Sequence, residues 1–222
     1  MHAPSAPPLS PYRWLIWVLA ILVLFIFAYR LFFEESTAIV GQVSQASELR
    51  RINDVPPFIL TERSGHTITN QDLRGKIWVA DFIFTTCPGP CPLITAGMVK
   101  VQEAVAADPH VQLVTFTVDP QTDTPAVLAA YADKFGADPN RWWFLTGPEK
   151  PLYDLIKNGF YQVVQDNHGQ PLEPGEYVVT HSTRLVLVDA DGVVRGSYDG
   201  IGPDGRTDLL QGIRTLEKEE NP

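Results

Sequence analysis

The chain contains two cysteines, Cys87 and Cys91, and both lie in the proline-rich stretch FTTCPGPCP at residues 84–92. Two thiols separated by three residues can form a disulfide, act as a redox couple or bind a metal ion with a third ligand. Thiolates are soft ligands, which favour Cu(I), zinc or iron–sulfur chemistry over magnesium or calcium. Because two cysteines are too few for a disulfide scaffold or a four-thiolate zinc site, a third group must decide the chemistry.

Histidine is the residue type that can complete such a site, and the chain has five of them. Four are expected at the exposed surface: His2, His66, His110 and His168. His181 differs because it lies in YVVTHSTRLVLVD, directly before a predicted β-hairpin, at a position expected to face the cysteine loop. An imidazole there would give a three-coordinate Cys2His site suited to copper. A hydrogen-bonded histidine at a strand edge is the alternative.

The elements that must position these residues can be predicted from the apolar pattern. Near-continuous apolar, β-rich runs predict buried strands at residues 77–84, 111–119 and 141–145. Helices are expected at residues 92–108, 124–136, 152–157 and 207–217, and a hairpin at 184–198, whereas 159–180 look irregular. This order predicts an α/β domain with a hairpin at the edge of its sheet, as in the thioredoxin-like fold.

The cysteine loop follows the strand at 77–84, at the edge of the sheet where reactive sites of α/β folds lie. Pro92 suits the first position of a helix, so the pair is expected in a stiff loop with Cys91 alone near the helix start. The positive end of that helix should favour thiolate over thiol. A thioredoxin-type redox site has two residues between its cysteines; three can let the sulfurs span a metal and still form a disulfide.

The N-terminal segment predicts a membrane anchor. Residues 14–33 are apolar apart from Arg30 and long enough to span a bilayer as a helix. Residues 1–13 then form a disordered tail, 34–57 a tether and 58–222 the globular domain. The charges that flank the segment place the N-terminus in the cytoplasm and the domain outside it, where free thiols tend to oxidise. A cleaved signal peptide is the alternative.

Composition excludes some other functions. With 45% hydrophobic and 19% charged residues, the chain can form a substantial core. The formal net charge is −9, and no basic patch is visible in the sequence. A nucleic-acid-binding surface needs clustered lysines and arginines, so nucleic acid is not an expected partner.

Three segments resemble the signatures of one family: FTTCPGPCP, TVDPQTDTP (117–125) and VTHSTRLVLVDADG (179–192). They look like those of the SCO/SenC family of membrane-anchored, thioredoxin-like copper proteins that assemble cytochrome c oxidase, over about residues 55–219. The resemblance implies that Cys87, Cys91 and His181 bind Cu(I) or Cu(II), and that the two thiols can also form a disulfide. Asp119 matches a family aspartate, which implies a supporting or docking role; an ordinary Asp-Pro turn is the alternative.

The resemblance implies a copper metallochaperone of the inner membrane that acts on the periplasmic side. It would deliver copper to the copper A site of cytochrome c oxidase, with other copper chaperones or thiol reductants as further partners. The alternative is a thiol-disulfide oxidoreductase that keeps the oxidase cysteines reduced, so enzyme activity stays open. Many relatives have an acidic residue between the cysteines, where this chain has Gly89-Pro90, and a basic residue at the position of Thr122. These two differences put partner docking and copper affinity in doubt. Peroxidase chemistry is disfavoured because Thr85 and Thr86 stand too close to Cys87.

Overall fold

The computed structural model describes residues 17–19, 21–27, 29, 49–169 and 179–220, and the chain divides into two units, Met1–Ser47 and Glu48–Pro222. In the first unit the described residues are helical, and their large apolar side chains are exposed. No helix among the described residues combines the length and the apolar character needed to cross a membrane. The expected tail at 1–13 and the ends of the expected anchor at 14–33 lie outside the described residues.

The second unit alternates strands and helices, as the apolar pattern predicts. Its elements, in chain order, are β1 (Asn53–Asp54), β2 (Ile59–Glu62), β3 (Thr67–Thr69), the 3₁₀ helix η1 (Asn70–Leu73), β4 (Ile77–Ile83), α2 (Cys91–Ala104), β5 (Val111–Thr117), α3 (Pro125–Lys134), β6 (Trp142–Thr146), α4 (Glu149–Asp154), the π-helical turn η2 (Leu155–Gly159), β7 (Val164–Asp166), β8 (Val179–His181), β9 (Arg184–Val188), β10 (Val193–Asp199) and α5 (Pro203–Glu220).

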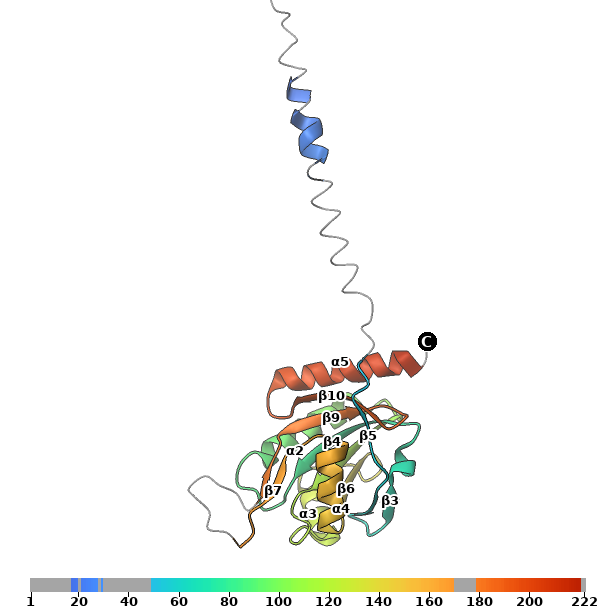
Figure 1. Ribbon diagram of the computed structural model, residues 1–222, viewed down its shortest axis with the longest axis vertical. Helices are drawn as coiled ribbons and strands as arrows, with labels where there is room; N and C mark the ends of the chain where they lie inside the picture. Colours follow the sequence, from blue (N-terminus) through green and yellow to red (C-terminus); the bar gives the residue numbers. More distant parts are fainter. Residues whose placement is uncertain (1–16, 20, 28, 30–48, 170–178, 221–222) are drawn as a thin grey trace, which may run out of the picture. The chain divides into compact units, whose positions relative to one another are not determined.

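The main sheet has the strand order β1-β10-β9-β4-β5-β6-β2-β3 (Figure 1). At its centre β4, β5 and β6 are parallel, and every residue of β4 and β5 is buried, which explains their near-continuous apolar sequences. The predicted hairpin forms β9 and β10, and β9 pairs antiparallel with β4. The α/β thioredoxin-like fold is therefore confirmed for this unit.

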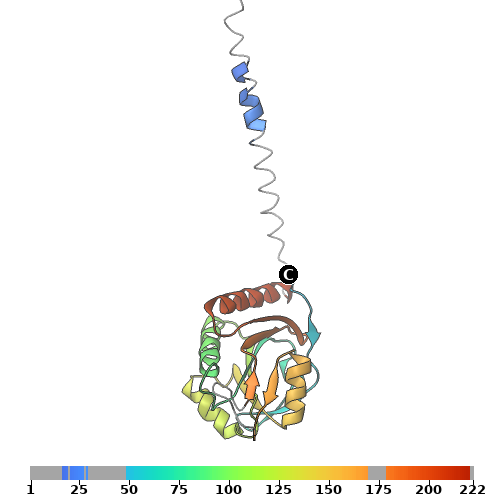
Figure 2. The same cartoon turned by 60° about the vertical axis from the view of Figure 1, so that its left-hand side comes forward.

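Helices cover both faces of this sheet (Figure 2). The connections through α2 and α3 lead from one parallel strand to the next, and both helices lie on one face, as right-handed crossovers require. The helix α4 lies on the other face, and α5 packs along β10 (Figure 1). Each parallel strand thus ends at the same edge of the sheet, which is where the cysteine loop begins.

One part of the fold differs from the sequence prediction. Residues expected to be irregular include β7 and β8, which form a separate two-stranded sheet. The chain approaches β7 through the π-helical turn η2 and then Tyr161, which has a φ of 53°. Because β8 ends at His181, this small sheet carries the candidate imidazole.

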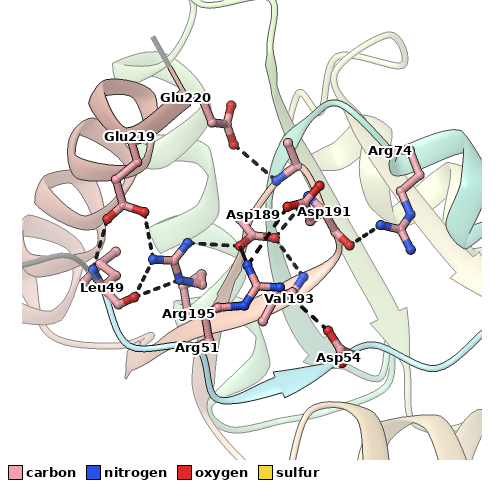
Figure 3. A network of polar contacts seen from close by, with 11 residues as sticks. Leu49, Arg51, Asp54, Arg74, Asp189, Asp191, Val193, Arg195, Glu219 and Glu220 are labelled. Atoms are coloured by element: carbon pink, nitrogen blue, oxygen red, sulfur yellow. Dashed lines mark hydrogen bonds and ion pairs between the residues drawn. The ribbon is translucent and has the colours of Figure 1, made fainter. Parts of the chain in front are cut away.

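A network of charged side chains lies at the end of β9 that is farther from His181 (Figure 3). The buried Arg195 donates to Asp189 Oδ2 at 3.0 Å, to Glu219 Oε2 at 2.7 Å and to the carbonyl oxygen of Leu49. It thereby holds the first residues of the domain against α5. The expected tether at 34–57 overlaps this region: its residues 49–57 include β1, which pairs with β10, so the packed domain begins before residue 58.

Candidate metal centre

The cysteine loop connects the end of β4 to the start of α2. Cys87 lies in the loop, where its backbone N–H donates to the Phe84 carbonyl oxygen at 3.2 Å. Cys91 is the first residue of α2, preceded by Pro90 at the N-cap and followed by Pro92 in the first turn. Proline is tolerated there because the first helical N–H groups have no acceptor within the helix. The prediction that only Cys91 lies at the helix start is confirmed.

His181 reaches the cysteines from the small β7–β8 sheet. Its Nε2 atom lies 3.1 Å from Cys91 Sγ, and its ring packs edge-on against Phe84 at a centroid separation of 5.6 Å. One ligand atom from each of Cys87, Cys91 and His181 lies within 4.8 Å of the other two. The structure therefore brings together the three residues that the sequence singled out, from three separate elements.

The hydrogen bonds of His181 fix which ring nitrogen has a lone pair. Its Nδ1 atom lies 2.9 Å from the Ser182 carbonyl oxygen, which can only accept a hydrogen bond. Nδ1 therefore carries the proton, and the lone pair of Nε2 points at Cys91 Sγ. Burial lowers the pKa of His181, which keeps the ring neutral. A neutral imidazole whose other nitrogen is bound to a carbonyl is the usual form of a metal-binding histidine.

The helix start was expected to favour the thiolate form of Cys91, but burial favours the protonated thiol. It raises the pKa of the Cys91 thiol well above its usual range, and a hydrogen bond with Cys87 adds to this increase. At Cys91, desolvation of the charge therefore opposes the preference for thiolate that the helix start predicts. Cys91 is 0% exposed and Cys87 6% exposed, and both are free thiols. Free thiolates are therefore disfavoured in this buried pair, whereas a soft cation can displace the thiol protons and neutralise the sulfurs as it binds.

Asp119 lies at the end of the neighbouring parallel strand and is buried. Its side chain accepts from the Thr122 backbone N–H at 3.3 Å and lies 3.7 Å from His168 Nε2. Its carbonyl oxygen accepts from the backbone N–H groups of Thr122 and Asp123, which is the geometry of an Asp-Pro turn. The other described histidines, His66, His110 and His168, lie at the surface as expected.

The burial of two aspartates was not predicted from the sequence. Asp123 is 0% exposed and accepts hydrogen bonds from Thr85 and Thr117. Asp81 on β4 is also 0% exposed, and only one of its oxygens has a partner among the described residues, Thr115 Oγ1 at 2.5 Å. A carboxylate inside the apolar run IWVADFIF was the signal for Asp81. For Asp123, the signal was its place just after a strand that ends beside the cysteine loop.

Comparison with known proteins places this arrangement in a family. The SCO1/SenC family model matches residues 47–216. The SCO1 protein homolog of Bacillus subtilis is 30% identical over 164 residues, which cover 73% of this chain and 82% of the relative. The structure of BsSco, a member of the Sco family of cytochrome c oxidase assembly proteins with a disulfide switch, is 29% identical, with a TM-score of 0.66 over 77% of this chain and 98% of BsSco.

A second solved structure is that of ScoI from Bradyrhizobium japonicum with copper bound. It is 26% identical to this chain and has a TM-score of 0.60, over 72% of this chain and 99% of ScoI. The family match covers all of the described domain except its last four residues, and it includes the cysteine loop, β8 and the strands that hold them in place. This chain therefore belongs to the SCO1/SenC family.

Proposed function

We propose that this protein binds one copper ion through the Sγ atoms of Cys87 and Cys91 and Nε2 of His181. The observation that carries the proposal is the convergence of these three ligand atoms within 4.8 Å, with the Nε2 lone pair directed at a sulfur. Two thiolates and an imidazole form a soft donor set suited to Cu(I), and they can also hold Cu(II). The copper-bound structure of ScoI, a relative of the same fold, supports the choice of metal.

The copper is cargo in this proposal, and the copper A site of cytochrome c oxidase is its destination. Family membership and the assembly role of BsSco support this destination. Cys91 is fully buried, whereas His181 is only partly buried, so an incoming ligand meets His181 first. Transfer then proceeds by ligand exchange, in which cysteines of the acceptor replace the two thiolates one at a time. Another copper chaperone supplies the ion, and a thiol reductant keeps the pair reduced.

We also propose that residues 14–33 anchor the protein in the inner membrane, with the copper-binding domain on the periplasmic side. The support is the apolar sequence of this segment and the helical, exposed state of its described residues, such as Leu24 and Phe25 at 67% and 71% exposure. In an extracytoplasmic compartment the thiols would oxidise readily, which makes a reductant necessary for loading.

A second candidate function uses the same cysteines without the metal. Reduced Cys87 and Cys91 would attack a disulfide of the oxidase subunit, transfer two electrons and two protons to it, and become a disulfide themselves. The proximity of the two sulfurs and the disulfide switch of BsSco favour this candidate. It requires both thiols but does not require His181, so the two functions can be separated by mutation.

A copper titration of the reduced chain, purified without oxygen, tests the first proposal. We expect one Cu(I) per chain, and we expect Cys87→Ser, Cys91→Ser and His181→Ala each to bind far more weakly. Unchanged binding by His181→Ala would contradict the ligand set. In a strain that lacks this protein, copper A content of the oxidase separates the two functions. Copper delivery requires all three residues, whereas restoration by His181→Ala but not by Cys87→Ser would favour thiol reduction.

A further inference from the structure

Asp123 is a buried carboxylate whose hydrogen bonds end on the cysteine loop. Oδ2 accepts from the Thr85 backbone N–H at 3.1 Å, and Oδ1 accepts from Thr85 Oγ1 at 2.5 Å. Oδ2 also accepts from Thr117 Oγ1 at 2.5 Å. No lysine or arginine forms an ion pair with Asp123 in the part of the chain that the structure describes. Three donors from two other segments therefore meet a single buried side chain.

These contacts connect the loop to the rigid part of the sheet. Thr85 stands two residues before Cys87, and Thr117 is the last residue of β5. Before Thr85 in the chain, the ends of β4 and β5 are already joined, since the Val118 N–H donates to the Ile83 carbonyl oxygen at 2.8 Å. After Thr85, the loop that carries Cys87 has few backbone hydrogen bonds of its own. Asp123 thus connects Thr85, two residues before the first cysteine, to Thr117 at the end of β5.

The hydrogen bonds of Asp123 offset the cost of burying its carboxyl group. Loss of this acceptor would leave the buried donors of Thr85 and Thr117 without their partner, which makes the position of Thr85 sensitive to Asp123. Asp123 is not a metal ligand, because its oxygens are engaged by hydroxyl and amide donors rather than directed at the sulfurs. Groups that orient metal ligands through hydrogen bonds usually affect metal affinity strongly, and Asp123 acts on Cys87 through Thr85.

We propose that Asp123 is a positioning residue for the copper site. By holding Thr85, it keeps Cys87 Sγ within bonding distance of the metal that Cys91 and His181 also bind. This inference rests on the proposed copper-binding function and adds a residue to it. It assigns to the second aspartate of DPQTD a role that Asp119, which lies toward His168, does not fill.

The test compares Asp123→Asn and Thr85→Val with the wild-type chain. The amide introduced by Asp123→Asn keeps one acceptor oxygen, whereas Thr85→Val removes one donor and keeps the backbone N–H. Competition against a chromophoric Cu(I) chelator measures affinity. We expect Asp123→Asn to bind Cu(I) roughly 10- to 100-fold more weakly, the usual range for partners that orient metal ligands, and Thr85→Val to weaken binding in the same direction. The thiolate-to-Cu(II) absorption band should also shift in both variants.

Asp189→Asn is the matched control. Asp189, which lies in the network of Figure 3, is another buried aspartate, but it follows the end of β9 that pairs with the start of β4, away from the cysteine loop. This substitution should lower stability and leave Cu(I) affinity and the absorption band unchanged. Wild-type affinity in both Asp123→Asn and Thr85→Val would overturn the proposal, as would an equal loss in Asp189→Asn. If Asp123→Asn does not fold, Thr85→Val decides the matter.

A metal-free measurement separates this inference from the proposed function. The loop is held by Asp123 while both thiols are free, so loss of Asp123 should destabilise the reduced state relative to the disulfide. In dithiothreitol redox buffers, Asp123→Asn should change the dithiol–disulfide equilibrium about tenfold, a shift of roughly 30 mV toward more negative potential. An unchanged or more positive potential would overturn the inference. A wild-type chain that binds no copper would instead refute the proposed function. The dithiol–disulfide potential of Asp123→Asn would still test whether Asp123 holds the cysteine loop.

Discussion

Replacement of Asp81 by asparagine should remove a specific pH dependence from the stability of the domain. Asp81 is fully buried in β4, and Thr115 Oγ1 donates to one of its oxygens at 2.5 Å. Thr115 Oγ1 in turn accepts from Trp142 Nε1 at 2.7 Å. The asparagine side chain keeps the shape of Asp81 and the acceptor for Thr115 but cannot ionise, so the substitution tests the charge rather than the packing.

The magnitude follows from the pKa of this carboxyl group. Burial raises the pKa of Asp81 from 3.8 to about 7. Between these values the folded protein holds a proton that the unfolded chain releases, so stability falls as pH rises and this contribution is fully lost above the folded pKa. Each pH unit in this window changes the free energy of unfolding by about 1.4 kcal/mol. Between about pH 5 and pH 8 the wild-type domain should lose about 3 kcal/mol on account of Asp81.

Urea unfolding of the reduced, metal-free chain at these two pH values measures the effect. Other groups also titrate, so the informative quantity is the difference between wild-type and Asp81→Asn at each pH. That difference should shift by about 3 kcal/mol in favour of the variant as pH rises. Asp133→Asn, an exposed aspartate on α3, should show no such shift. Parallel pH profiles for wild-type and Asp81→Asn would refute the reasoning that burial keeps this carboxyl protonated.

Two further substitutions test other parts of the structure. Arg195→Met leaves Asp189 and Glu219 without their buried partner. It should lower the free energy of unfolding by about 3–5 kcal/mol and leave copper affinity unchanged. A loss below about 1 kcal/mol in urea unfolding would contradict this expectation. Gly200→Ala places a Cβ atom 2.5 Å from the Thr183 carbonyl oxygen, two residues after His181. It should cost about 1–3 kcal/mol and weaken copper binding measurably, and a fully stable variant with wild-type affinity would show that this contact relaxes freely.

Much of the fold could be predicted because its central strands are buried on both faces. β4 and β5 appear in the sequence as near-continuous apolar runs, and Thr124, which accepts from the Val127 N–H at 3.4 Å, caps α3 at the expected position. The convergence of Cys87, Cys91 and His181 was predictable from topology, because β9 is antiparallel to β4 and therefore begins, just after His181, at the edge of the sheet where β4 ends.

The features that escaped prediction depend on tertiary contacts. β7 and β8 have three residues each, too few for a periodic pattern, and the chain reaches β7 through η2 and Tyr161, whose φ is 53°. Asp123 has the sequence context of a turn residue, and its burial arises from the meeting of the cysteine loop with the end of β5. The raised pKa of Cys91 likewise reflects burial, which no local spacing encodes.

X-ray absorption spectroscopy of the Cu(I)-loaded, reduced chain tests the central claim most directly, because it reports the atoms bound to the metal. Two sulfur ligands and one imidazole nitrogen are expected in the wild-type chain, with the nitrogen contribution lost in His181→Ala. A site with sulfur ligands alone in both proteins, or one in which His181→Ala leaves the spectrum unchanged, would contradict the three-ligand copper centre.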